Sequence, residues 1–347
     1  MDKRAITPAR LAASVIAVPP LARDSNLRID AVENQKIARF IEAGGVNMLL
    51  YGGNAVLYHV RPSEYARLLQ VLSEIAGENT LIVPSVGPAF GTMMDQVDVL
   101  SDFDFPTVMI LPQKDIADAG GIASGIRRFV DAYGKPIVLY LKHDRWLPPA
   151  VVGEMFSNGI ISWIKYAVVR DDPARDDYLK EVLTHVPGEI VVSGIGEQPA
   201  ITHLRDFEIT GFTSGCVCVN PARSQQMLRA IQAGDMALAE QIRADFRKLE
   251  DLRNSINPIR VLHRAVELAE IARTGPMLPM LGELNPEQTT VVAAAIACPV
   301  SVSVFDGNVG DAQVLCCCRQ VETIECHQNE SASGVRNTDM VIERALP

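Results

Sequence analysis

The first 215 residues alternate between two hydrophobic patterns. Short runs of consecutive apolar residues are typical of buried strands. They predict eight strands, at residues 14–18, 47–51, 81–86, 107–111, 137–141, 160–165, 189–193 and 211–214. The longer segments between them have the period of amphipathic helices, and residues 63–77 show it well. Their apolar face is Tyr65, Leu68, Leu69, Leu72 and Ile75, and their charged face is Glu64, Arg67 and Glu74.

Eight strands that each precede a helix are the element count of an α/β (β/α)8 TIM barrel. A doubly wound open sheet is the competing fold, but no G-x-G-x-x-G follows an early strand. From about residue 221 to 275 the pattern predicts only helices. We therefore predict a TIM barrel with additional C-terminal helices, divided as barrel 1–225, helical extension 226–292 and an atypical tail 293–347.

The tail differs from the rest of the chain because four of the seven cysteines lie within eleven of its residues, at Cys316, Cys317, Cys318 and Cys326. Three adjacent cysteines do not fit one tetrahedral ion, and paired C-x2-C loops are absent. An appendage without a metal is the favoured interpretation, and a metal cluster is the alternative.

Composition is that of an ordinary globular enzyme, with 48% hydrophobic and 21% charged residues and a net charge of −10. Clustered Lys and Arg, which nucleic-acid binding needs, are missing. No apolar run is long enough for a membrane span, and the N-terminus has no clean signal-peptide core. We expect a soluble cytoplasmic protein with reduced cysteines, which binds neither nucleic acid nor membrane.

Activity in a barrel belongs to the carboxyl ends of its strands and the loops that follow. Lysines and tyrosines gather at these predicted ends, whereas Asp and Glu do not, which favours amine chemistry over a metal site. Lys165 ends the apolar run IISWIK, where burial lowers the pKa of an amine and activates it for Schiff-base formation. The alternative is a structural lysine whose ammonium group reaches solvent.

Seven segments in order resemble the dihydrodipicolinate synthase / N-acetylneuraminate lyase superfamily over residues 12–290. They are LYGGNA, VLYLK, YLKHDR, WIKY, SGIGEQPA, VNPARSQQML and the stretch from INPIRVLHR to GELNPEQ. These proteins are class I aldolase-like barrels that act on pyruvate and other 2-keto acids. The resemblance implies Lys165 as the Schiff-base lysine and Tyr140 as the proton relay. It also implies that Arg145 binds a second carboxylate, and that Gly194 lies in the strand-seven region.

The family's carboxylate cradle, Gly-Thr-Thr-Gly-Glu, corresponds to a segment that has changed. Tyr51 and Gly52 replace both threonines, and Asn54 replaces the glutamate, while the backbone of Gly52 and Gly53 can still receive a carboxylate. Tyr51 offers a hydroxyl from a new position. Elsewhere, Gln113 or Lys114 replaces the family's second tyrosine, and Tyr166 follows the lysine in place of Glu.

We therefore predict a Schiff-base-forming lyase, an aldolase, hydratase or dehydratase for pyruvate or another 2-keto acid, rather than a true dihydrodipicolinate synthase. It would use no cofactor other than the imine at Lys165, would hold no metal, and by resemblance would form a homodimer or homotetramer. The alternatives are a catalytically impaired barrel that binds a small molecule or acts as a scaffold, and a metal-dependent aldolase.

Overall fold

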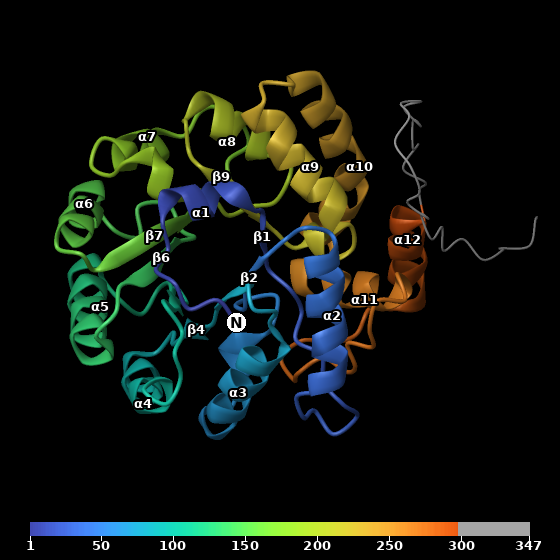
Figure 1. Ribbon diagram of the computed structural model, residues 1–347, viewed down its shortest axis with the longest axis horizontal. Coiled ribbons are helices and arrows are strands. Elements are labelled where there is room, and N and C mark those ends of the chain that lie inside the picture. Colours follow the sequence, from blue (N-terminus) through green and yellow to red (C-terminus); the bar gives the residue numbers. More distant parts are fainter. Residues whose placement is uncertain (298–347) are drawn as a thin grey trace, which may run out of the picture. The chain divides into compact units, whose positions relative to one another are not determined.

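The computed structural model describes residues 1–297, and these form a closed ring of parallel strands surrounded by helices (Figure 1). The strand order is β3-β2-β1-β9-β8-β7-β6-β5-β4. The strands are β1 Ile16–Ala17, β2 Met48–Leu50, β3 Leu81–Val83, β4 Ser85–Val86, β5 Met109–Ile110, β6 Ile137–Leu141, β7 Ile161–Tyr166, β8 Val191–Ser193 and β9 Gly211–Ser214. Pro84 is the only residue between β3 and β4, and it interrupts the ladder because proline has no N–H. The two segments therefore act as one barrel strand. The predicted TIM barrel is confirmed.

All strand pairs are parallel, and β1 contacts both β2 and β9. Seven of the eight apolar runs contain a strand or, at residues 81–86, the pair β3 and β4, and β7 extends one residue beyond its predicted run. The register of β6 against β7 pairs Tyr140 with Lys165, and β7 against β8 pairs Lys165 with Val192. Parallel pairing brings all carboxyl ends to one rim of the barrel, so the register already places two predicted site residues side by side.

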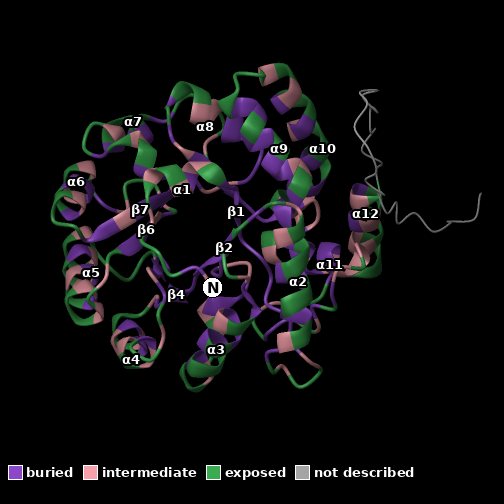
Figure 2. Cartoon of the chain, in the orientation of Figure 1, coloured by how far each residue is buried: buried purple, intermediate pink, exposed green. Residues whose placement is uncertain are grey.

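Helices surround the strands because each has one apolar face that the barrel covers. They are α1 Pro8–Ala13, α2 Ala31–Ala43, α3 Tyr65–Ile75, α4 Phe90–Leu100, α5 Ala119–Tyr133, α6 Pro149–Ser157, α7 Asp177–Leu183, α8 Ala200–Asp206 and α9 Pro221–Gln232. In α3 the residues predicted to face inward are buried, while Arg67 and Glu74 are exposed. Figure 2 shows this division, with buried strands and outward helix faces exposed.

Three further helices follow, α10 Met236–Ser255, α11 Pro258–Leu268 and α12 Pro286–Ile296. α10 packs along α9, and α11 and α12 pack on α10 (Figure 1). The additional C-terminal helices are confirmed. The predicted boundary at residue 225 falls inside α9, and all described residues belong to one compact unit, so the division into domains stays a prediction. The tail cysteines lie outside the described residues.

No helix among residues 1–297 is long and apolar enough to cross a membrane.

Candidate active site

Lys165 lies inside the barrel mouth, near the carboxyl end of β7. Neighbouring side chains of a strand point to opposite faces, and the Tyr166 hydroxyl donates to Asp176 Oδ2 of the helix layer at 2.7 Å. Lys165 therefore points inward, on the same face as the buried Trp163. Its side chain is 4% exposed, and within residues 1–297 no hydrogen bond or ion pair reaches its ammonium group.

Burial is the main cause that lowers the pKa of Lys165 to about 7, and the positive charges of Lys142 and Arg253 add to it. A charged amine loses hydration inside the barrel, and nearby cations disfavour the charged form further. About half of the amine is then neutral near pH 7, whereas an ordinary lysine is almost fully charged there.

Tyr140 covers Lys165 from the neighbouring strand. The Lys165 Nζ lies 4.6 Å from the centre of the Tyr140 ring, close enough for a cation–π contact when the amine is charged. Burial raises the pKa of the Tyr140 hydroxyl, and the nearby Tyr58 raises it further. Tyr140 therefore stays a neutral phenol over the physiological range, able to give a proton to a developing alkoxide.

Tyr58 and Lys142 complete this side of the mouth. The Tyr58 hydroxyl donates to the carbonyl of Pro112 at 3.1 Å, and Lys142 Nζ lies 5.9 Å from the Tyr58 ring centre. Burial raises the pKa of Tyr58 to about 12. Sequence reasoning missed Tyr58, which lies four residues after Asn54 in the loop that follows β2. A tyrosine so close to the glycine pair was the available signal.

The residues that follow β2 lie in different environments. The Tyr51 side chain is fully buried, its hydroxyl has no partner within the described chain, and the charges acting on it are those of Cys218 and Glu42. No hydrogen bond within residues 1–297 joins this hydroxyl to Lys165. A Cβ on Gly52 would lie 2.7 Å from the Met109 side chain, whereas one on Gly53 would meet nothing within 4 Å.

Asn54 holds its loop against two other parts of the chain. Its Nδ2 donates to the carbonyl of Val18 at 2.8 Å, and its backbone carbonyl lies 2.8 Å from His263 Nε2 on α11. Burial lowers the pKa of His263 to about 4, so this ring is neutral. The Asn54 Oδ1 accepts from Arg253 on α10 at 3.5 Å. Asn54 thus links the predicted cradle to the C-terminal helices.

Arg145 lies elsewhere, because its guanidinium is paired with Glu181 on α7 through Nη1 at 2.8 Å and also through Nη2. Both side chains are about half exposed. No contact in the described part of the chain joins Arg145 to Lys165 or Tyr140. The pair with Glu181 uses two of the five guanidinium N–H donors and neutralises the charge with which Arg145 would attract a substrate carboxylate.

Gly194 follows β8 and lies against Lys165. An added Cβ would come within 2.7 Å of the Ala167 Cβ, 2.9 Å of the Tyr166 carbonyl and 3.0 Å of the Lys165 Cγ. Two of these three atoms cannot move without the backbone. Gly194 is therefore required by close approach, and it keeps room for the lysine stem.

We expect Gly194→Ala to displace Lys165 and to lower the free energy of unfolding by about 1–3 kcal/mol, as overpacking does. Gly53→Ala is the matched control, because a Cβ there meets nothing within 4 Å. Urea denaturation of both variants measures the effect. Equal stabilities for the two alanine variants would contradict this account of Gly194.

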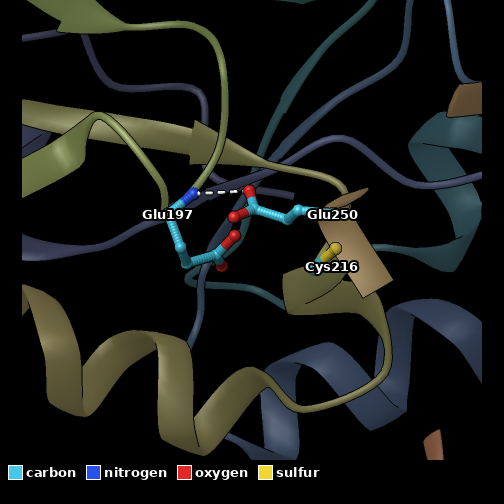
Figure 3. A group of neighbouring side chains, drawn as sticks. All are labelled: Glu197, Cys216 and Glu250. Carbon is cyan, nitrogen blue, oxygen red and sulfur yellow. Dashed lines mark hydrogen bonds between the residues drawn. The ribbon is translucent and has the colours of Figure 1, made fainter. Parts of the chain in front are cut away.

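A second buried group joins the loop after β8, the 3-10 turn Cys216–Cys218 and α10 (Figure 3). One ligand atom each of Glu197, Cys216 and Glu250 lies within 4.8 Å of the others. The Glu197 N–H donates to Glu250 Oε1 at 2.8 Å, and Ser214 donates to Glu197 Oε2 at 2.7 Å. Sequence reasoning considered only the residues directly at the strand ends and so missed this group.

Two buried carboxyl groups this close share a proton. Burial and the charge of Glu197 raise the pKa of Glu250 well above its ordinary value, and Glu250 Oε2 is buried without an acceptor or donor among the described residues. A proton on this carboxyl keeps it neutral beside the charge of Glu197. The Arg253 Nη1 lies 3.8 Å from Cys216 Sγ, and a guanidinium there opposes a cation between the three donors. We interpret the group as a protonated acid pair.

The acid pair makes a pH-dependent contribution to stability. A carboxyl whose pKa is raised on folding stabilises the protein below its unfolded value, and this is lost as pH rises through the folded value. Glu250→Gln keeps a neutral hydrogen-bonding group that does not titrate. We expect its stability relative to wild type to increase from pH 5 to pH 8, by at most about 1.4 kcal/mol per pH unit.

Urea denaturation at both pH values checks this expectation. Glu240→Gln is the control, because Glu240 lies half exposed on the same helix and pairs with Arg243. A difference between Glu250→Gln and wild type that stays constant with pH would rule out the shared proton.

No protein-family model matches the chain, and no curated protein matches its sequence. Solved structures do match. A dihydrodipicolinate synthase from Bacillus clausii superposes with a TM-score of 0.74 at 23% identity, over 84% of this chain and 98% of that one. The chain has the dihydrodipicolinate synthase fold. The synthase from Oceanobacillus iheyensis agrees, with a TM-score of 0.73 at 22% identity, over 83% and 96% of the two chains.

A third match is YagE, a prophage protein of the dihydrodipicolinic acid synthase family from E. coli K12, solved in complex with pyruvate. It superposes with a TM-score of 0.71 at 16% identity, over 81% of this chain and 96% of that one. The resemblance found in the sequence motifs therefore extends to the fold of nearly the whole of each matched protein. At these identities the fold is shared, and the reaction has to be argued from the site.

Proposed function

We propose that the protein is a Schiff-base-forming lyase for pyruvate or another 2-keto acid. The observation that carries this proposal is the buried Lys165 amine, which has no carboxylate partner within residues 1–297 and lies 4.6 Å from the Tyr140 ring. A structural lysine would find an acceptor or reach solvent. An almost fully buried amine without an acceptor, at the carboxyl rim of a barrel, suits nucleophilic attack on a carbonyl.

The reaction begins when the neutral Lys165 Nζ attacks the C2 keto carbon. Tyr140 gives a proton to the keto oxygen, which leaves as water with one proton from the amine and one from the phenol. The resulting iminium ion at C2 withdraws electrons from C3. Loss of a proton from C3, or cleavage of a bond between C3 and its substituent, therefore becomes easier. The backbone of Gly52 and Gly53 is positioned after β2, where the family places its carboxylate cradle.

Borohydride reduction tests the proposal. The protein is incubated with pyruvate, 2-ketobutyrate and 2-ketoglutarate in turn, reduced, and its intact mass and modified peptide are measured. We expect a mass increase at Lys165 with at least one 2-keto acid. An unmodified Lys165 across the whole panel would refute the proposal.

The alternative is a barrel that binds a small molecule without converting it. Two observations favour it, the Tyr51 hydroxyl that is buried without a partner among the described residues, and the pairing of Arg145 with Glu181. In both cases a side chain that turnover would use is kept away from the substrate. This alternative predicts that a 2-keto acid stabilises the protein against heat equally well in wild type and Lys165→Ala, whereas the lyase loses most of that effect.

A further inference from the structure

Arg253 of α10 reaches the rim of the barrel from the C-terminal helices. Its Nη2 lies 3.5 Å from Asn54 Oδ1, and its Nε donates to the carbonyl of Pro258 at 3.2 Å. A Cβ on Gly215 would lie 2.6 Å from the same Nη2, so the guanidinium lies directly on the backbone after β9. This glycine makes the close approach possible.

Arg253 has no carboxylate partner within ion-pair distance in the described part of the chain. The acids whose charges act on it are Glu250 and Glu197, and burial raises the pKa of each. A guanidinium has five N–H donors, and the contacts to Asn54, Cys216 and Pro258 use three of them. Free donors and positive charge therefore remain at the barrel rim.

The charges around the mouth suit one added anion. Arg253 and Lys142 are the two cations whose charges act on Lys165, and neither pairs with a carboxylate within residues 1–297. A monocarboxylate 2-keto acid would bring an anion to these cations, whereas a neutral carbonyl compound would not.

We propose that Arg253 binds the carboxylate of the 2-keto acid that reacts with Lys165, with Asn54 orienting the guanidinium. This inference rests on the proposed function and adds to it the group that selects acids over neutral carbonyl compounds. The planar guanidinium matches a carboxylate through two parallel hydrogen bonds. It offers donors in place of the threonine hydroxyls that the segment after β2 lacks.

The test compares pyruvate with pyruvamide, which has the same keto group and no charge. Borohydride trapping is followed by intact mass against probe concentration in wild type, Arg253→Gln and Arg253→Lys. For Arg253→Gln we expect the half-trapping concentration of pyruvate to rise by about 10- to 100-fold, equivalent to about 1.5–3 kcal/mol for a charged hydrogen bond. The value for pyruvamide should change by less than about threefold, within the uncertainty of such comparisons. For Arg253→Lys, the half-trapping concentration of pyruvate should lie between the values of wild type and Arg253→Gln.

Arg247→Gln is the matched control, because Arg247 is an exposed arginine on the same helix. It should trap both probes like wild type. If Arg253→Gln does not fold, Arg253→Lys decides through its selectivity for pyruvate over pyruvamide. An equal change for the two probes, or no change for either, would overturn the role of Arg253 and leave the Schiff-base proposal intact.

Failure of the proposed function can be distinguished from failure of the Arg253 role, because wild type would then trap no 2-keto acid. In that case, pyruvate binding is followed by ligand NMR line broadening. Loss of binding in Arg253→Gln supports the carboxylate site, and unchanged or absent binding overturns it.

Discussion

Lys165→Met is expected to stabilise the folded protein while abolishing covalent trapping by 2-keto acids. Lowering the pKa of a lysine from 10.5 to about 7 costs the folded state up to about 4 kcal/mol near neutral pH, since each pH unit corresponds to about 1.4 kcal/mol. Met fills similar volume without charge, and the apolar wall beside Trp163 suits it. We expect the free energy of unfolding to rise by about 1–3 kcal/mol, less than the full cost, because Met does not reproduce all the packing of the lysine stem.

The sign of the pH dependence follows from the lowered pKa. The unfolded chain binds more protons at this site than the folded protein between pH 7 and 10, so the destabilisation by Lys165 weakens as pH rises through that range. The advantage of Lys165→Met should therefore shrink from pH 7 to pH 9. Urea denaturation at the two pH values measures it.

Lys142→Met is the control, because Lys142 is an exposed cation at the same rim. The Lys142→Met variant should still form the reducible imine with a 2-keto acid at Lys165. Since the charge of Lys142 helps to lower the pKa of Lys165, the trapping rate should reach half its maximum at a higher pH than in wild type. A Lys165→Met variant that is less stable than wild type at pH 7 would contradict the unpaired, buried amine.

Tyr140→Phe is expected to slow imine formation by about 10²- to 10⁴-fold, the contribution of a positioned general acid. The ring remains to cover Lys165, so the pH at which trapping is half maximal should hardly move. The rate of imine formation by rapid-quench reduction measures the effect. Kinetics are decisive here, because the extent of trapping at long times does not depend on the acid.

Tyr58→Phe is the matched variant. Its hydroxyl donates to the carbonyl of Pro112 and is thereby occupied, so its loss should slow imine formation far less than the loss of the Tyr140 hydroxyl. Equal losses in the two variants would mean that Tyr58 and Tyr140 act as one proton-transfer unit. A normal rate in Tyr140→Phe would remove Tyr140 from the reaction.

The strands were predictable because their signal is local. A buried parallel strand is a short apolar run, and each predicted run contains or overlaps the strand that the structure places there. The neighbours of Lys165 were predictable for the same reason, since consecutive barrel strands pair and Tyr140 lies on the strand before it. The resemblance to a known family then predicted which of these residues react.

The contacts of Arg145 and Tyr51 were not predictable from spacing. Arg145 follows Tyr140 by five residues, as in the family, yet its φ of 50° and its pairing with Glu181 on α7 direct it elsewhere. Tyr51 ends its run at the carboxyl rim, but its side chain is fully buried and its hydroxyl has no partner among the described residues. Position along the chain does not determine the direction of a side chain beyond the end of a strand.

The sequence by itself determined the barrel and the additional helices and predicted the lysine at the end of the sixth strand, because hydrophobic period and motif order are properties of neighbouring residues. Only the tertiary structure decided what surrounds that lysine. Asn54 and Arg253 are 199 residues apart, and Glu197 and Glu250 are 53 apart. Their charges and protons depend on distances set by the docking of α10 on the barrel, since Coulomb energy and desolvation act through space.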